Sequence, residues 1–66
     1  MPERVDPRDL VGAAEIAERL GIVRQSVHQL RRRHADFPEP VAVLAQAMVW
    51  SWPEIEAWAR ATGRLR

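Results

Sequence analysis

The sequence contains no cysteine and no lysine, and it has no long apolar segment. The absence of cysteine excludes disulfides and thiolate metal sites. The two histidines, His28 and His34, lack the i, i+3 or i, i+4 spacing that places two metal ligands on one helix face. No apolar run approaches the ~20 residues of a membrane span, and no signal-peptide core follows Met1. We therefore expect no metal, no cofactor, no membrane partner and a cytoplasmic location.

The chain is short, with 66 residues, of which 47% are hydrophobic and 29% are charged. This balance is typical of a folded domain, and the length allows only one domain with a small core. A chain of this size rarely encloses a pocket that excludes water. The sequence therefore predicts a protein that is not an enzyme, with no catalytic residues.

The charge is distributed unevenly along the chain. All ten basic residues are arginines, which the codon bias of a GC-rich genome would explain. That bias does not explain their placement: residues 19–35 carry five arginines and no acid, a local charge of +5, whereas the remainder carries −4. A stretch of one sign requires either solvent or a partner of opposite charge. An anionic partner is the better fit.

The first periodic segment spans residues 13–20, where apolar residues recur at helical spacing. Gly12 precedes it as an N-cap, and Glu15 stands at the third helical position, from which its side chain can reach back to the cap. Gly21 follows as a stop signal. The pattern predicts a helix over residues 13–20.

A second helix is predicted over residues 24–34, after a turn of three residues. Val23, Val27 and Leu30 form an apolar stripe, although Val23 is a poor N-cap, a defect of about 1 kcal/mol. The opposite face is polar and carries Gln25, His28, Gln29 and Arg32, flanked by Arg24 and Arg31. These two helices form a helix–turn–helix pattern.

The remainder of the chain predicts a hairpin and a third helix. Prolines exclude helix over residues 36–40, and short apolar runs over residues 41–50 predict a small hairpin. Ser51 and Glu54 form a capping-box pattern that starts a helix over residues 52–62. The predicted core consists of Ile16, Leu20, Val27, Leu30, Trp50, Ile55 and Trp58. Residues 1–9 are predicted to be a flexible tail, residues 10–63 the domain, and residues 64–66 a C-terminal tail.

At this point the chain resembles a known family, the excisionase and AlpA-type, MerR-related DNA-binding domains. The resemblance is carried by EIAERLGI at residues 15–22, RQSVHQL at 24–30, DFP at 36–38, VW at 49–50 and IEAW at 55–58. It implies a mostly α-helical winged helix–turn–helix with three helices and a short hairpin wing. The second helix would enter the major groove of DNA, and the wing would approach the minor groove.

The resemblance also implies roles for individual residues. Base contacts are expected from Arg24, Gln25, Ser26, His28 and Gln29. Independently of the resemblance, Arg31, Arg32 and Arg33 lie late in the second helix and, together with Arg19, are expected to contact phosphates. Two of these expectations have an alternative without DNA contact. The arginine run is also typical of a solvated helix end, and His28 could be exposed without contacting a base.

Two departures separate this chain from the family pattern. Val23 stands where serine or threonine is usual, and residues 45–48 of the wing carry neither glycine nor a basic residue. The apolar tip of the wing, assigned to Met48, is therefore unexplained. Trp52, at the first position of the third helix, could pack in the core or stay half exposed and contact a partner.

The sequence thus predicts a small, nucleoid-associated protein that binds double-stranded DNA in a sequence-specific manner. It would be a transcriptional regulator or an excisionase-like recombination directionality factor. Further copies bound side by side, or an integrase or transcription partner, would supply the affinity that one small module lacks. The alternative is a winged-helix adaptor or antirepressor that contacts proteins and does not itself bind DNA.

Overall fold

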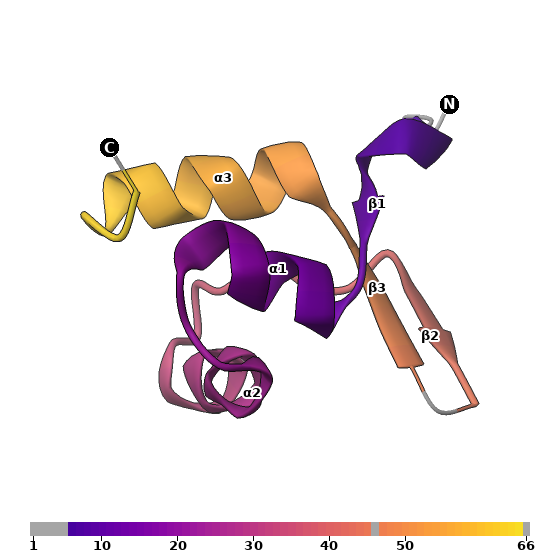
Figure 1. Ribbon diagram of the computed structural model, residues 1–66, viewed down its shortest axis with the longest axis horizontal. Coiled ribbons are helices and arrows are strands. Elements are labelled where there is room, and N and C mark those ends of the chain that lie inside the picture. The colour runs from indigo at the N-terminus through magenta and orange to yellow at the C-terminus, as the bar shows by residue number, and fades with distance from the viewer. Residues whose placement is uncertain (1–5, 46, 66) are drawn as a thin grey trace.

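A computed structural model describes residues 6–45 and 47–65 of the chain. Helix α1 (Ala13–Leu20) lies between helix α2 (Arg24–Arg33) and helix α3 (Trp52–Ala61), as Figure 1 shows. Strands β2 (Ala42–Leu44) and β3 (Ala47–Ser51) form a hairpin that projects beyond the helices. This arrangement confirms the predicted winged helix–turn–helix, with three helices at nearly the predicted bounds.

A third strand completes the sheet, and sequence reasoning did not predict it. Strand β1 (Leu10–Val11) pairs antiparallel with β3, so that the strand order is β1-β3-β2. A 3-10 helix, η1 (Pro7–Asp9), precedes β1, and the Asp6 side chain accepts a hydrogen bond from the Arg8 backbone N–H. This bond and the Arg8 side chain lower the pKa of the Asp6 carboxyl. Regular structure therefore begins inside the predicted tail, of which residues 1–5 lie outside the described residues.

The local signals around α1 act as predicted. The Glu15 side chain accepts a hydrogen bond of 2.7 Å from the backbone N–H of Gly12. At the other end Gly21 adopts a φ of 71°, which allows the Ile22 N–H to donate to the Ala17 carbonyl at 2.9 Å. A left-handed glycine of this kind terminates a helix at little steric cost. The turn that directs α2 is therefore encoded locally.

Two predicted features of the helix starts are wrong. Ser51 is the N-cap of α3, but its side chain makes no capping hydrogen bond. Ser51 also ends β3 as a buried partner of Leu10, so strand pairing governs the backbone there. Val23 is 68% exposed and does not join a stripe with Val27, because as N-cap it precedes the first turn of α2.

The core is built on tryptophans and one phenylalanine. Phe37 lies edge-on to both Trp50 and Trp58, with ring centroids 6.2 Å and 4.9 Å apart respectively. Phe37 is an addition to the predicted core. Five predicted members are buried, namely Ile16, Val27, Trp50, Ile55 and Trp58. Leu20 and Leu30 are only partly buried at its edge, so the prediction was wrong for these two.

Candidate nucleic-acid interface

The solvent face of α2 is polar and basic. Val27 is fully buried against α1, and this anchor turns the opposite side of the helix outward. Gln25 and the three arginines of the last turn are exposed, while His28 and Gln29 are half-buried. No acid occurs in α2. The helix therefore presents hydrogen-bonding groups and positive charge and has no carboxylate of its own.

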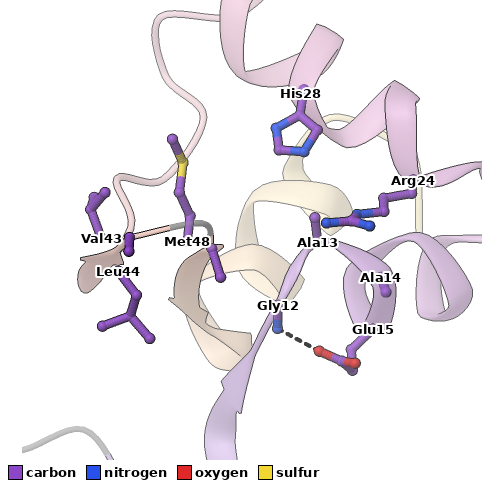
Figure 2. A pocket seen from close by; sticks show the side chains of 11 residues that line it. Gly12, Ala13, Ala14, Glu15, Arg24, His28, Val43, Leu44 and Met48 are labelled. Carbon is purple, nitrogen blue, oxygen red and sulfur yellow. Dashed lines mark hydrogen bonds between the residues drawn. The ribbon is translucent and has the colours of Figure 1, made fainter.

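A cleft of about 470 Å³ separates α2 from the wing. Figure 2 shows Arg24 and His28 from α2 on one wall and Val43 and Met48 from the wing on the other. The N-terminus of α1 forms the floor, where the Glu15 carboxylate is held by the Gly12 N–H. Two predicted base-contacting residues thus share one side of α2, facing the wing.

Ser26 lies on the other flank of α2. It borders a second depression together with Leu20, Ile22 and Leu30, where the chain after α3 also approaches. The structure therefore divides the predicted base-contacting set, since Arg24 and His28 line the cleft and Ser26 does not. With about 100° per residue, Gln25 and Gln29 lie between these two flanks.

Arg19 is placed apart from the other predicted DNA-contacting residues. Its guanidinium carbon lies 4.8 Å from the ring centroid of Trp52, at the start of α3. A cation over an aromatic face is an attractive arrangement. This contact directs the Arg19 side chain toward α3, whereas the other predicted phosphate-contacting arginines are all on α2 (Figure 1 shows α1 between these two helices).

The end of α2 carries a contact that sequence reasoning missed. An Nη2 of Arg64 lies 3.1 Å from Nε2 of His34, and the same guanidinium lies over the ring of Trp58, 5.1 Å from its centroid. The His34 ring also meets Trp58 edge-on at 5.6 Å. This cluster fastens the segment after α3 to the end of α2 and leaves Arg31, Arg32 and Arg33 exposed. No periodicity signal links residues 30 positions apart, so only the fold reveals it.

The wing exposes apolar side chains at a different place from the one predicted. Met48 is half-buried and packs against the core, so the prediction of Met48 as the apolar tip is wrong. The exposed apolar residues are Val43, at 66%, and Leu44, at 59%. In the hairpin Val43 pairs with Met48, and Leu44 pairs with Ala47. Residues 40–53 are entirely uncharged, which is the sequence signal for this surface.

These elements define a small winged helix–turn–helix protein with a basic second helix. Within the described residues, no group of three or more acidic or histidine side chains is arranged to hold a metal ion. In the same part of the chain, no helix combines the length and apolar character that crossing a membrane requires.

Residues 9–65 match the family model of the prophage CP4-57 regulatory protein, AlpA. The chain belongs to this AlpA family of phage regulatory, DNA-binding proteins, which is not an enzyme family. Comparison with curated proteins and with solved structures gave no match. Membership makes the protein a small DNA-binding regulator.

Proposed function

We propose that the protein binds double-stranded DNA in a sequence-specific manner with α2 in the major groove. The observation that carries this proposal is the solvent face of α2, which is basic, rich in amide side chains and free of acids. Arginine and glutamine are the side chains suited to paired hydrogen bonds with guanine and adenine respectively. The regulatory outcome would be control of transcription or of the direction of a recombination reaction.

The proposed roles follow from position on α2. By helical geometry Gln25 and Gln29 lie on the side of α2 opposite Val27. Arg24 and His28 lie on the side of the cleft, and these four residues would contact bases. Ser26, on the opposite flank, would reach only the rim of the groove. A protein with this role acts where the DNA is, so we expect it in the cytoplasm, associated with the nucleoid.

The exposed arginines at the end of α2 are placed for phosphates. Arg31, Arg32 and Arg33 follow the base-contacting turn and are free of acidic neighbours on their own helix. Such contacts supply affinity and orientation rather than sequence preference. The phosphate contact predicted for Arg19 is not part of this proposal, because Arg19 would have to leave Trp52.

The wing favours a second candidate function. The wing exposes Val43 and Leu44 and carries no charge, so it has no electrostatic attraction to the phosphates of DNA. An adaptor that contacts an integrase or a polymerase through this surface would use the same fold. The basic face of α2 has no role in that candidate, which is why we place it second.

A titration of labelled duplex DNA at several salt concentrations tests the proposal. Each phosphate contact adds close to one unit to the slope of log affinity against log salt concentration. Selection of bound sequences from a random duplex pool then tests sequence preference. The absence of any salt-dependent duplex binding below the concentration at which the protein aggregates would overturn the proposal in favour of the adaptor function.

A further inference from the structure

The last turn of α2 has little hold on the core through its own side chains. The only buried residue of this helix is Val27, near its middle, and Leu30 is partly buried one turn later. The three arginines of the last turn are exposed and anchor nothing. The next residue, His34, is the C-cap of α2 and is half-buried. The position of the arginine-bearing end therefore depends on what His34 contacts.

Two residues from a distant part of the chain hold His34. Its ring lies edge-on to the ring of Trp58, with centroids 5.6 Å apart, and its Nε2 lies 3.1 Å from an Nη2 of Arg64. The Arg64 guanidinium also lies over the Trp58 ring, 5.1 Å from its centroid. We refer to His34, Trp58 and Arg64 as the clasp. It joins the end of α2 to α3 and to the segment after α3.

The backbone that carries Arg64 is held independently of the Arg64 side chain. Gly63 adopts a φ of 76°, and the Arg64 N–H then donates to the Ala59 carbonyl at 2.7 Å. Turns of this kind, with a left-handed glycine, close the ends of helices. Leu65 is partly buried against the core. The guanidinium can therefore leave His34 without unfolding the segment that carries it.

The contact between Arg64 and His34 requires one protonation state of the histidine. A guanidinium has only N–H donors, so the Nε2 of His34 accepts and the proton of the neutral ring is on Nδ1. A protonated imidazole is a donor at both nitrogens. Protonation would place N–H against N–H and one positive charge against another. The contact therefore exists only while His34 is neutral.

We propose that Arg64 is a positioning residue, which holds the arginine-bearing end of α2 through neutral His34 and releases it when His34 is protonated. Histidine is the side chain that changes charge between about pH 5 and 8. The clasp therefore stabilises the last turn of α2 at the upper end of this range, and this stabilisation is lost as the pH falls. The inference rests on the proposed function only for the role of the arginines, because the clasp itself forms without DNA.

Other charged groups surround His34 without the same contact. Arg31, one turn earlier on α2, and Glu39, in the proline segment, line a small depression together with His34. Asp36, in the turn after α2, is exposed. Among the described residues, no ion pair joins His34 to either carboxylate, and Arg64 is the charged group within hydrogen-bond distance of the ring. Arg64 is therefore the group whose contact depends directly on the charge of the imidazole.

Amide hydrogen exchange in the protein without DNA tests the proposal. The reporter is the His34 N–H, which donates to the Leu30 carbonyl at 2.9 Å and closes the last turn of α2. The internal reference is the Ile22 N–H, which donates to the Ala17 carbonyl in the turn after α1. Exchange is measured at about pH 7.5 and about pH 5.5, on either side of the histidine transition, and is corrected for the intrinsic rate in each histidine state.

The wild-type protein should lose protection at one end of α2 only. We expect the protection of the His34 N–H to fall about tenfold from the higher to the lower pH, the scale of a hydrogen bond to a charged group. Protection of the Ile22 N–H should not change, because local opening of a helix end leaves the rest of the fold closed. Equal protection of His34 at both pH values would overturn the proposal.

Three variants assign the effect to the clasp. His34→Gln keeps an acceptor that does not titrate in this range, so protection should stay high at both pH values. Arg64→Met removes the donor and should show low protection at both. Arg60→Met is the matched control, because it removes the same charge from an exposed arginine that pairs with Glu56, and it should behave as the wild-type protein.

The variants can also contradict the proposal. An Arg64→Met variant that keeps the wild-type protection at the higher pH would overturn it. So would a pH effect that persists in Arg64→Met and disappears in Glu39→Gln, since the carboxylate would then be responsible. Thermal melting shows which variants fold, and the comparison of Arg64→Met with Arg60→Met is sufficient if His34→Gln does not.

Duplex DNA binding at about pH 7.5 tests whether the clasp matters for function. Arg64→Met should weaken binding about fivefold more than Arg60→Met, the lower end of the usual coupling between two sites. His34→Ala should weaken binding similarly, because it releases Arg64 without removing its charge. Unchanged binding by His34→Ala beside weaker binding by Arg64→Met would make Arg64 a direct DNA contact and overturn the positioning role. Absence of duplex binding by the wild-type protein would overturn the proposed function, while the exchange result would still decide the clasp.

Discussion

The indole Nε1 of Trp50 donates a hydrogen bond of 3.1 Å to the carbonyl oxygen of Pro38. This bond ties β3 to the proline segment between α2 and the wing. Trp58, which also packs edge-on against Phe37, lacks an equivalent bond: its buried Nε1 has no acceptor among the residues that the structure describes. The two core tryptophans therefore pack edge-on against the same phenylalanine, but only Trp50 has a hydrogen-bonded indole N–H.

This difference predicts unequal costs for the same substitution. Trp50→Phe should destabilise the protein more than Trp58→Phe, by about 1–3 kcal/mol, because only the former leaves a carbonyl without its donor. Chemical denaturation of both variants against the wild-type protein measures the difference. Equal free energies of unfolding for the two variants would show that the Pro38 bond contributes nothing.

Complete removal of the Trp58 ring should have a much larger effect. Trp58 contacts Phe37, His34 and Arg64, so Trp58→Ala removes the link between the core and the segment after α3. We expect a loss of about 3–5 kcal/mol, which approaches the total stability of so small a domain. A Trp58→Ala variant that melts at the temperature of the wild-type protein would contradict this packing.

A better N-cap at the start of α2 should stabilise the protein. Val23 is the N-cap, has an extended backbone and makes no capping bond, and its side chain is largely exposed. Val23→Ser should stabilise the protein by about 1 kcal/mol, because a hydroxyl oxygen can accept from a free N–H of the first turn. Val23→Ala is the control and should not stabilise. The melting temperatures of both variants and of the wild-type protein measure the effect. A lower melting temperature for Val23→Ser would mean that the valine side chain contributes packing.

Two kinds of substitution on α2 should separate affinity from sequence preference. Changing Arg32 and Arg33 together to Gln should weaken binding to all duplexes and reduce the salt slope by about two units. Gln25→Ala should leave the slope unchanged and cost about 1–3 kcal/mol of preference at one base pair. Titrations at several salt concentrations with a selected sequence and its single-base variants provide both quantities. An unchanged slope for the arginine variant would remove these residues from the phosphate contacts.

The effect of an added arginine in the wing should depend on how buried the substituted position is. Ala47 is exposed beside the cleft, so Ala47→Arg should tighten DNA binding and increase the salt slope by about one unit. Met48→Arg places the same charge at a half-buried site that packs on the core, and we expect it to destabilise the fold. Melting temperature and duplex affinity, measured on both variants, separate the two effects. Tighter binding by Met48→Arg at unchanged stability would show that the half-buried site is open to charge.

The helices were predictable because their boundaries are encoded in neighbouring residues. Gly12 with Glu15 starts α1, Gly21 ends it, and Pro53 near the first turn of α3 suits a helix start. Each signal acts within four residues, so it survives in any fold that the chain adopts. Ser51 shows the limit of this reasoning, since pairing with β1 coincides with the cap position and the predicted side-chain bond does not form.

The division of the candidate site into flanks was not predictable from α2 alone. A helical wheel places Ser26 near the polar residues, but only the neighbouring turn and the chain after α3 make its surroundings a groove. Arg19 belongs to the same basic stretch as the α2 arginines, yet Trp52, 33 positions later, determines where it lies. Contacts between distant segments have no local signature.

By itself, the sequence determined the three helices, the turn between the first two, the uncharged wing and the basic, acid-free second helix. These features depend on local backbone preferences and on which side chains are present. The tertiary structure alone decided that β1 completes the sheet, that Met48 packs inward while Val43 and Leu44 remain exposed, and that Leu20 and Leu30 border a groove. The physical reason is that burial depends on how elements pack against one another, and a core closed by Phe37, Trp50 and Trp58 leaves those two leucines at its edge.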